Sequence, residues 1–182
     1  MTPQDFNELL LNRRSIRRYT EEAISADDVK LILEAALLAP TSKNSHSTRF
    51  VLVDDRDKLK AMSECRTMGA GPIAGAAVAV VVCGDSSKSD VWVEDCSIAA
   101  AYMQLQAAAL GLGSCWIQIR GRYGADNASA EETIQEMLGL PGHVCVECVV
   151  TLGHKNEQRK PLDPEKTMWE NVHIEQWTDR GE

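Results

Sequence analysis

The chain has 182 residues, of which 44% are hydrophobic, and this size and composition predict one domain with a single core. Its 19 Lys and Arg residues stand against 27 Asp and Glu residues, so the formal charge of −8 argues against nucleic acid as a partner. The amino terminus lacks a basic or apolar targeting region, and the most apolar run, residues 76–83, is too short to span a bilayer. We therefore expect a cytoplasmic protein that does not enter membranes.

The six cysteines are scattered through periodic segments, which predicts reduced thiols rather than a disulfide framework. Cys145 and Cys148 have the spacing of a redox or zinc pair. The valines around them alternate as in a strand, however, and no second pair completes a zinc site. The sequence favours a packing role for both, and we expect no metal site.

Two helices open the chain. Thr2 as N-cap and Pro3 in the first turn predict a short helix that ends near Asn12. A second helix follows Ser25, which resembles the first residue of a capping box, and it stops before Pro40.

The rest of the core alternates strands with helices. In chain order, the pattern predicts a strand at residues 49–54, a strand covered on both faces at 76–83, a long helix at 91–110, a strand at 114–119, a helix between Ser129 and Gly139, and a last strand at 143–152. Helices therefore cover a sheet of about four strands.

The last part of the chain differs in pattern. From residue 153 onward there are two prolines, many charges and two tryptophans, without a sustained helical or strand period. We therefore divide the chain into a core of residues 1–154 and an extension of residues 155–182 that is not part of that core.

Several short motifs point away from common nucleotide sites. The glycines of residues 69–75 have the wrong spacing for a dinucleotide-binding turn and precede a strand instead of joining a strand to a helix. No P-loop spacing occurs, and the four histidines are too scattered to predict a metal shell or a catalytic triad.

A basic turn follows the first helix. Arg13, Arg14, Arg17 and Arg18 fall within six residues of one another, around Ser15. Guanidinium groups of this kind suit a phosphate dianion, although the composition alone also fits a solvated run of charge. A second cationic pair, Arg159 and Lys160, follows the last strand, and the two clusters could converge on one anion.

Four motifs occur in an order that resembles the nitroreductase family of FMN flavoproteins. They are Arg13-Arg-Ser-Ile-Arg17 after the first helix, Ala39-Pro-Thr-Ser-Lys-Asn44 after the second, Gly111-Leu-Gly-Ser-Cys-Trp-Ile117 entering a strand, and Leu152-Gly-His154 after the last strand. Each motif is short, but together they span nearly the whole chain.

The resemblance implies an α+β fold with a mixed or antiparallel sheet of four to five strands covered by helices. It also implies a homodimer whose C-terminal extension, residues 155–182, packs on the other subunit, with FMN at the subunit interface. By the same resemblance, the FMN phosphate is held by Arg13, Arg14, Ser15, Arg17 and Arg159 or Lys160. The resemblance places the flavin ring between two further groups: Pro40, Thr41, Ser42 and Asn44 of the partner chain, and Cys115, Trp116, Ile117 and Gln118.

The activity that the resemblance implies is an FMN-dependent NAD(P)H oxidoreductase. NADH or NADPH donates electrons to FMN, and FMN then passes them to a nitroaromatic or quinone in a ping-pong sequence. No side chain is needed as a catalytic acid or base. Two features depart from relatives: His46-Ser47-Thr48 follows Asn44, and residues 63–75 are short and Gly-rich. Reductive dehalogenation, flavin modification and a non-catalytic flavin-binding redox sensor remain alternatives.

Overall fold

The structure, a computed structural model, describes residues 2–177. Its helices and strands are α1 (Pro3–Asn12), α2 (Ala26–Leu37), β1 (Thr48–Val53), α3 (Arg56–Met62), β2 (Val78–Asp85), α4 (Trp92–Ala109), β3 (Gly113–Gln118), α5 (Ala130–Leu138) and β4 (Val144–Gly153), with short 3-10 helices η1 (Ser42–Asn44), η2 (Gly71–Ile73), η3 (Pro164–Lys166) and η4 (Trp169–Asn171).

The four strands form one antiparallel sheet in the order β1-β2-β4-β3. β2 lies inside the sheet, and every one of its residues is buried, as a strand covered on both faces requires. The α+β fold expected from the sequence is confirmed, with the sheet entirely antiparallel among its paired strands.

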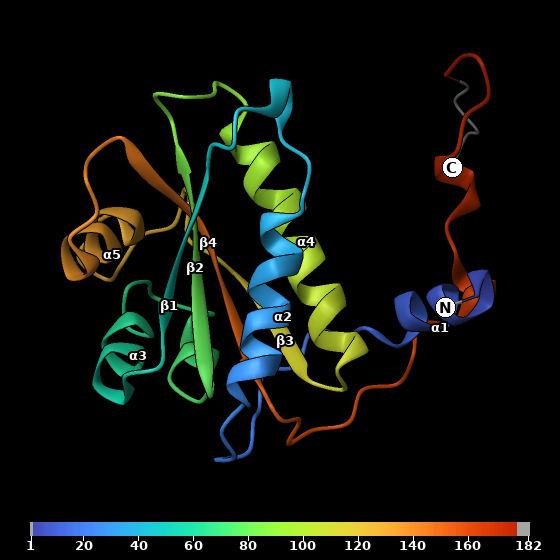
Figure 1. The fold of residues 1–182 in the computed structure, drawn as a ribbon, viewed down its shortest axis with the longest axis horizontal. Coiled ribbons are helices and arrows are strands. Elements are labelled where there is room, and N and C mark those ends of the chain that lie inside the picture. The colour runs from blue at the N-terminus through green and yellow to red at the C-terminus, as the bar shows by residue number, and fades with distance from the viewer. Residues whose placement is uncertain (1, 178–182) are drawn as a thin grey trace.

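Each face of the sheet has its own hydrophobic core (Figure 1). On one face, α3 and α5 cover a cluster that includes Leu59 and Ile134. On the other face, α2 and α4 cover a cluster that includes Ile32 and Met103. All four side chains are fully buried, so the sheet and these helices stabilise one another without any second chain.

Local capping explains where the helices begin. The side-chain oxygens of Thr2, Ser25 and Ser129 each accept a backbone N–H three residues later, as the sequence predicted for α1, α2 and α5. Helix α3 was not predicted; its cap is Asp55, which accepts from the Lys58 N–H. With seven residues, α3 is too short to show a clear helical period.

A β-bulge interrupts the pairing of β2 with β4. Val82 pairs with Cys148 and Cys83 with Val146, so Glu147 has no residue opposite it. Glu147 is only 4% exposed, and its Oε2 has no hydrogen-bond partner among the described residues. The bulge therefore holds a carboxylate inside the protein.

Two segments lie outside this two-sided body. α1 contributes no buried residue, and residues 158–177 are exposed apart from His173, which is half-buried. They lie together on one side of the body (Figure 1), where the Leu162 N–H donates to the Leu11 carbonyl over 2.8 Å. We call these two segments the arms.

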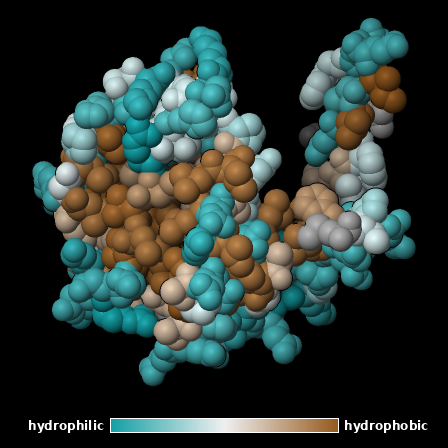
Figure 2. All heavy atoms as spheres, in the orientation of Figure 1, coloured by the Kyte–Doolittle hydropathy of each residue, from teal (hydrophilic) through white to brown (hydrophobic). Residues whose placement is uncertain are grey.

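The arms carry large apolar side chains in contact with solvent. Trp169 is 70% exposed and Ile174 80%, and Phe6 and Leu10 of α1 are also exposed. Figure 2 shows hydrophobic residues on the arms and a broader hydrophobic area on the body over α2 and β1. Within residues 2–177, no helix is long and apolar enough to cross a membrane.

Candidate functional site

The basic turn crosses the end of the sheet at two glycines. Gly113 of β3 pairs with Gly153 of β4. A Cβ on Gly113 would lie 2.8 Å from Ile16 Cγ2, and one on Gly153 would lie 2.7 Å from Tyr19 Cδ1. Only residues without a side chain let the turn pack this closely. This gives a physical reason for Gly113 in the motif of residues 111–117 and for Gly153 in the motif of residues 152–154.

The segment after β4 pairs with the same turn. The Thr20 N–H donates to the His154 carbonyl over 2.9 Å, and the Asn156 N–H donates to the Arg18 carbonyl over 3.0 Å. The two cationic segments, distant in sequence, are therefore held side by side at the end of the sheet.

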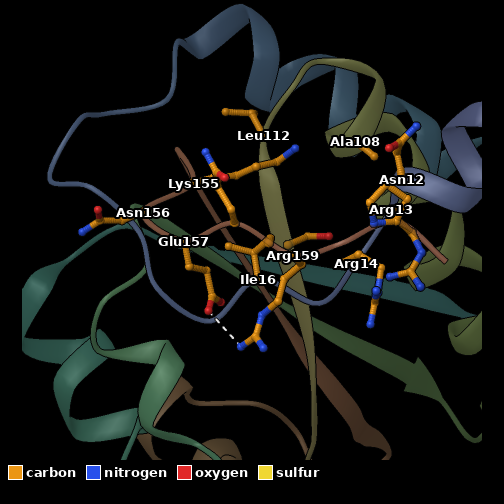
Figure 3. A pocket seen from close by; sticks show the side chains of 13 residues that line it. Asn12, Arg13, Arg14, Ile16, Ala108, Leu112, Lys155, Asn156, Glu157 and Arg159 are labelled. Atoms are coloured by element: carbon orange, nitrogen blue, oxygen red, sulfur yellow. Dashed lines mark ion pairs between the residues drawn. The ribbon is translucent and has the colours of Figure 1, made fainter.

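Between them lies a cavity of about 720 Å³, a volume in the usual range of ligand sites. Arg13, Arg14 and Arg159 line it, together with Lys155 and Ser114 (Figure 3). A second cavity of about 570 Å³ shares Arg159 and is also lined by Arg17. Lys160 lines neither cavity, but its carbonyl accepts from the Arg14 guanidinium.

A carboxylate that the sequence reading did not select lies at the junction of these two cavities. Glu157 Oε1 accepts the Arg17 N–H over 2.6 Å, and Oε2 lies 2.8 Å from Arg159 Nη2. Figure 3 shows this carboxylate turned toward the Arg159 guanidinium. The Arg17 backbone N–H holds the pKa of Glu157 below its ordinary value, with the Arg159 charge adding to the effect.

Strand β3 presents two different faces to this region. The side chains of Cys115 and Ile117 are buried in the core, whereas Trp116 and Gln118 are half-buried on the opposite face. Of these four residues, Cys115 and Ile117 could meet a ligand only through their backbone. Burial also raises the pKa of the Cys115 thiol, which favours an unreactive thiol.

β3 is an edge strand, and both ends of its outer edge already make hydrogen bonds. The Ser114 carbonyl accepts the Ile16 N–H over 2.9 Å, and the Gln118 carbonyl accepts from the Arg66 guanidinium. Because alternate residues of a strand direct their backbone groups to the same edge, the N–H and C=O of Trp116 face outward between these two contacts. This places an outward-facing backbone donor and acceptor two residues along β3 from Ser114, which lines the cavity.

The Trp116 and Gln118 side chains belong to a hydrogen-bonded chain. Trp116 Nε1 donates to Gln118 Oε1 over 2.8 Å, and Gln118 Nε2 donates to Glu147 Oε1 over 3.3 Å. Arg120 Nε lies 4.0 Å from Glu147 Oε2. Burial is the main reason that the pKa of Glu147 is raised.

The loop after α2 lies at the other end of α4. Asp95, in the first turn of α4, contacts this loop, whereas Ala108, in the last turn, lines the cavity. The cavity of the same chain is therefore not near the predicted ring contacts of the loop, which are Pro40, Thr41, Ser42 and Asn44. Figure 1 shows the loop and the basic turn at opposite ends of α2 and α4.

This loop has an uncommon backbone. Lys43, Asn44 and His46 have φ values of 51°, 54° and 47°, in the left-handed region that residues other than glycine rarely adopt. Each such residue costs on the order of 1 kcal/mol. None of the three is a glycine, and this conformation was not expected from the residue pattern.

Comparison with known proteins identifies the family of this chain. The family model described as "Nitroreductase family" matches residues 10–68 and 64–154. The chain belongs to the nitroreductase family.

Individual nitroreductase relatives cover most of the chain. A solved structure from Clostridium difficile R20291, described as an FMN-dependent nitroreductase, is 43% identical with a TM-score of 0.91 and covers 94% of this chain and 99% of its own. A protein of Archaeoglobus fulgidus, provisionally named NADH dehydrogenase/NAD(P)H nitroreductase, is 36% identical over 174 residues, with 93% of this chain and 97% of the relative covered. The Bacillus subtilis FMN reductase [NAD(P)H] is 28% identical over 183 residues, with 87% and 70% covered.

Proposed function

We propose that this nitroreductase-family chain is an FMN-dependent NAD(P)H oxidoreductase that acts on small planar acceptors. The observation that carries the proposal is the cationic cavity of about 720 Å³ at the end of β3, next to an outward-facing backbone edge. Relatives described as an FMN-dependent nitroreductase and an FMN reductase support the choice of cofactor.

The cavity residues fit a phosphate monoester. Arg13, Arg14, Arg159 and Lys155 bring positive charge to one hollow of a chain whose overall charge is negative. Guanidinium groups donate in a fork that matches phosphate oxygens. We assign Arg13, Arg14, Ser15, Arg17 and Arg159 to the phosphate, with Lys160 supporting Arg14 through its carbonyl.

The outer edge of β3 would hold the flavin ring. The Trp116 backbone offers one donor and one acceptor there, and Arg66 brings a positive charge to the Gln118 end of the edge. When bound, FMN supplies a two-electron carrier between NAD(P)H and the acceptor. The chain's own residues bind and orient, so no side chain is required as a catalytic acid or base.

The positions of the loop and the cavity favour a homodimer. From Asp95 to Ala108, α4 rises about 20 Å at ~1.5 Å per residue, so the loop cannot complete the cavity of its own chain. Ile98 and Tyr102, midway between these ends, are 38% and 41% exposed. A two-fold axis at this point sets α4 antiparallel to its copy and brings each loop to the partner's cavity.

The C-terminal arm would then cover the partner. β1 has no neighbour on its outer edge in the described sheet. Beside it, α2 and β1 form a groove of about 520 Å³ lined by Leu33, Leu37 and Leu52. The exposed Trp169 and Ile174 need such an apolar surface, and we place the arm on the partner's groove. Residues 178–182 of the proposed extension lie outside the described residues.

Steady-state kinetics test the proposed reaction. One ring accessible from one side serves NAD(P)H and the acceptor in turn, so varying both should give parallel double-reciprocal lines with a nitroaromatic or a quinone. Intersecting lines would rule out the ping-pong sequence. Absence of FMN-dependent NAD(P)H oxidation with any acceptor would overturn the function itself. The cytoplasm, where NAD(P)H is generated, is the compartment we propose.

A further inference from the structure

Asp95 is a buried carboxylate with all of its described hydrogen bonds directed to one loop. It is 2% exposed. Its Oδ1 accepts the Ser42 N–H over 2.8 Å, and its Oδ2 accepts from Ser47 Oγ over 2.7 Å and from Ser45 Oγ over 3.3 Å. A residue of α4 thus holds the beginning, middle and end of the loop that follows α2.

The loop depends on outside support, because its backbone is unfavourable. Its left-handed residues, Lys43, Asn44 and His46, lie between or beside the serines that Asp95 holds. Internal contacts, such as the His46 N–H donating to Thr41 Oγ1 over 3.1 Å, close the turn but do not attach it to the body. At the end of the loop, the Asp85 N–H donates to the Ser47 carbonyl and the Arg49 guanidinium donates to the His46 carbonyl, each over 2.8 Å. Asp95 also holds the beginning and middle of the loop, through Ser42 and Ser45.

We propose that Asp95 is a positioning residue that fixes residues 41–47 in the shape required at the partner's FMN site. This inference rests on the proposed function, because it needs a cofactor at the end of β3 and a second copy of the chain. Asp95 acts through Ser42 and Ser47 and does not touch the cofactor. The two carboxylate oxygens are needed because backbone and hydroxyl donors approach from three points of the loop.

A simpler role for Asp95 would be to stabilise the amino-terminal end of α4, where acidic residues are favourable. Glu94 provides the matched control, since it lies in the same first turn, carries the same charge and is exposed. Glu94→Gln removes one negative charge from the helix end without removing a described loop contact.

The first experiment compares FMN binding by Asp95→Ala, Asp95→Asn and Glu94→Gln. Binding is measured from the quenching of flavin fluorescence. Loss of a charge-assisted hydrogen-bond set should weaken binding by Asp95→Ala about tenfold to hundredfold. Asp95→Asn should recover most of this affinity, because its amide oxygen can still accept from Ser42 while its NH₂ donates to the serine hydroxyls. Glu94→Gln should bind as the wild type does. Equal loss in Asp95→Ala and Glu94→Gln would overturn the proposal.

The second experiment asks where Asp95 acts. A heterodimer carries Asp95→Ala in one subunit and Arg17→Ala in the other. If each loop serves the partner's cavity, both defects fall in the cavity of the Arg17→Ala subunit, and the other cavity has neither defect. The heterodimer should recover roughly half of the wild-type turnover, because a two-fold dimer has two equivalent sites. No recovery means that Asp95 acts within its own chain or only on folding, and overturns the proposal. A wild-type dimer without FMN binding would instead refute the proposed function.

Discussion

The body and the arms of this molecule differ in how far their apolar side chains are buried. In the body, side chains such as Ile134 and Met103 are fully buried between the sheet and its own helices. In the arms, Trp169 is 70% exposed and α1 has no buried residue. One chain therefore combines a part whose apolar side chains are buried in its own core with a part whose large apolar side chains are exposed.

The largest test of this comparison is to remove the C-terminal arm. A chain that stops after Gly153 keeps all four strands but lacks Lys155, Glu157 and Arg159 of the cavity. We expect complete loss of both FMN and the dimer, measured by flavin absorbance and sedimentation velocity. A chain that stops after Leu162 retains those cavity residues and should lose mainly the dimer. If the shorter protein sediments as a flavin-loaded dimer, the arm has neither role.

A smaller effect is expected where body and arm meet. Arg17 belongs to the turn that packs on the sheet, and its side chain lines the cavity that it shares with Arg159 of the arm. Arg17→Ala should weaken FMN binding about tenfold to hundredfold, since a charge-assisted phosphate contact is worth about 1.5–3 kcal/mol. Arg122→Ala, which removes the same charge from an exposed site away from the cavity, is the control. Equal affinities of the Arg17→Ala variant and the wild type would place the phosphate elsewhere.

The smallest expected effect concerns the body alone. Burial raises the pKa of Glu147 in the folded state, so ionisation of this group opposes folding. The cost is absent below the carboxyl's ordinary pKa in the unfolded chain and grows as pH rises through its higher folded value. Glu147→Gln keeps the contact with Gln118 and should therefore raise the melting temperature at pH 8 more than at pH 4. A larger gain at pH 4 would contradict this assignment.

Much of the body could be predicted from the sequence, because its elements have clear periods and caps. Four helices and four strands lie within a few residues of their expected bounds, and β2 is central and doubly covered as its valines indicated. Helix α3 could not be found because seven residues contain too little periodicity. The dimer, the swapped arm and the roles of individual cavity residues stay predictions.

The contacts that organise the candidate site were harder to foresee. The sequence analysis selected neither Asp95, which falls within the expected helix at residues 91–110, nor Glu157, which falls in the charged extension. Their importance comes from which distant backbone N–H groups they meet, Ser42 for one and Arg17 for the other. Such pairings depend on the tertiary fold, which a local pattern of residues does not contain.

The order of the strands also has a consequence for the growing chain. β2 lies between β1 and β4, yet α4, β3 and α5 are all synthesised before β4. Until β4 leaves the ribosome, one edge of the valine-rich β2 has no partner, although in the finished protein every residue of this strand is buried. A largely apolar strand with an open edge is prone to pair with other chains. We expect nascent chains that end before Val144 to require a chaperone, and the full-length chain to be released from it.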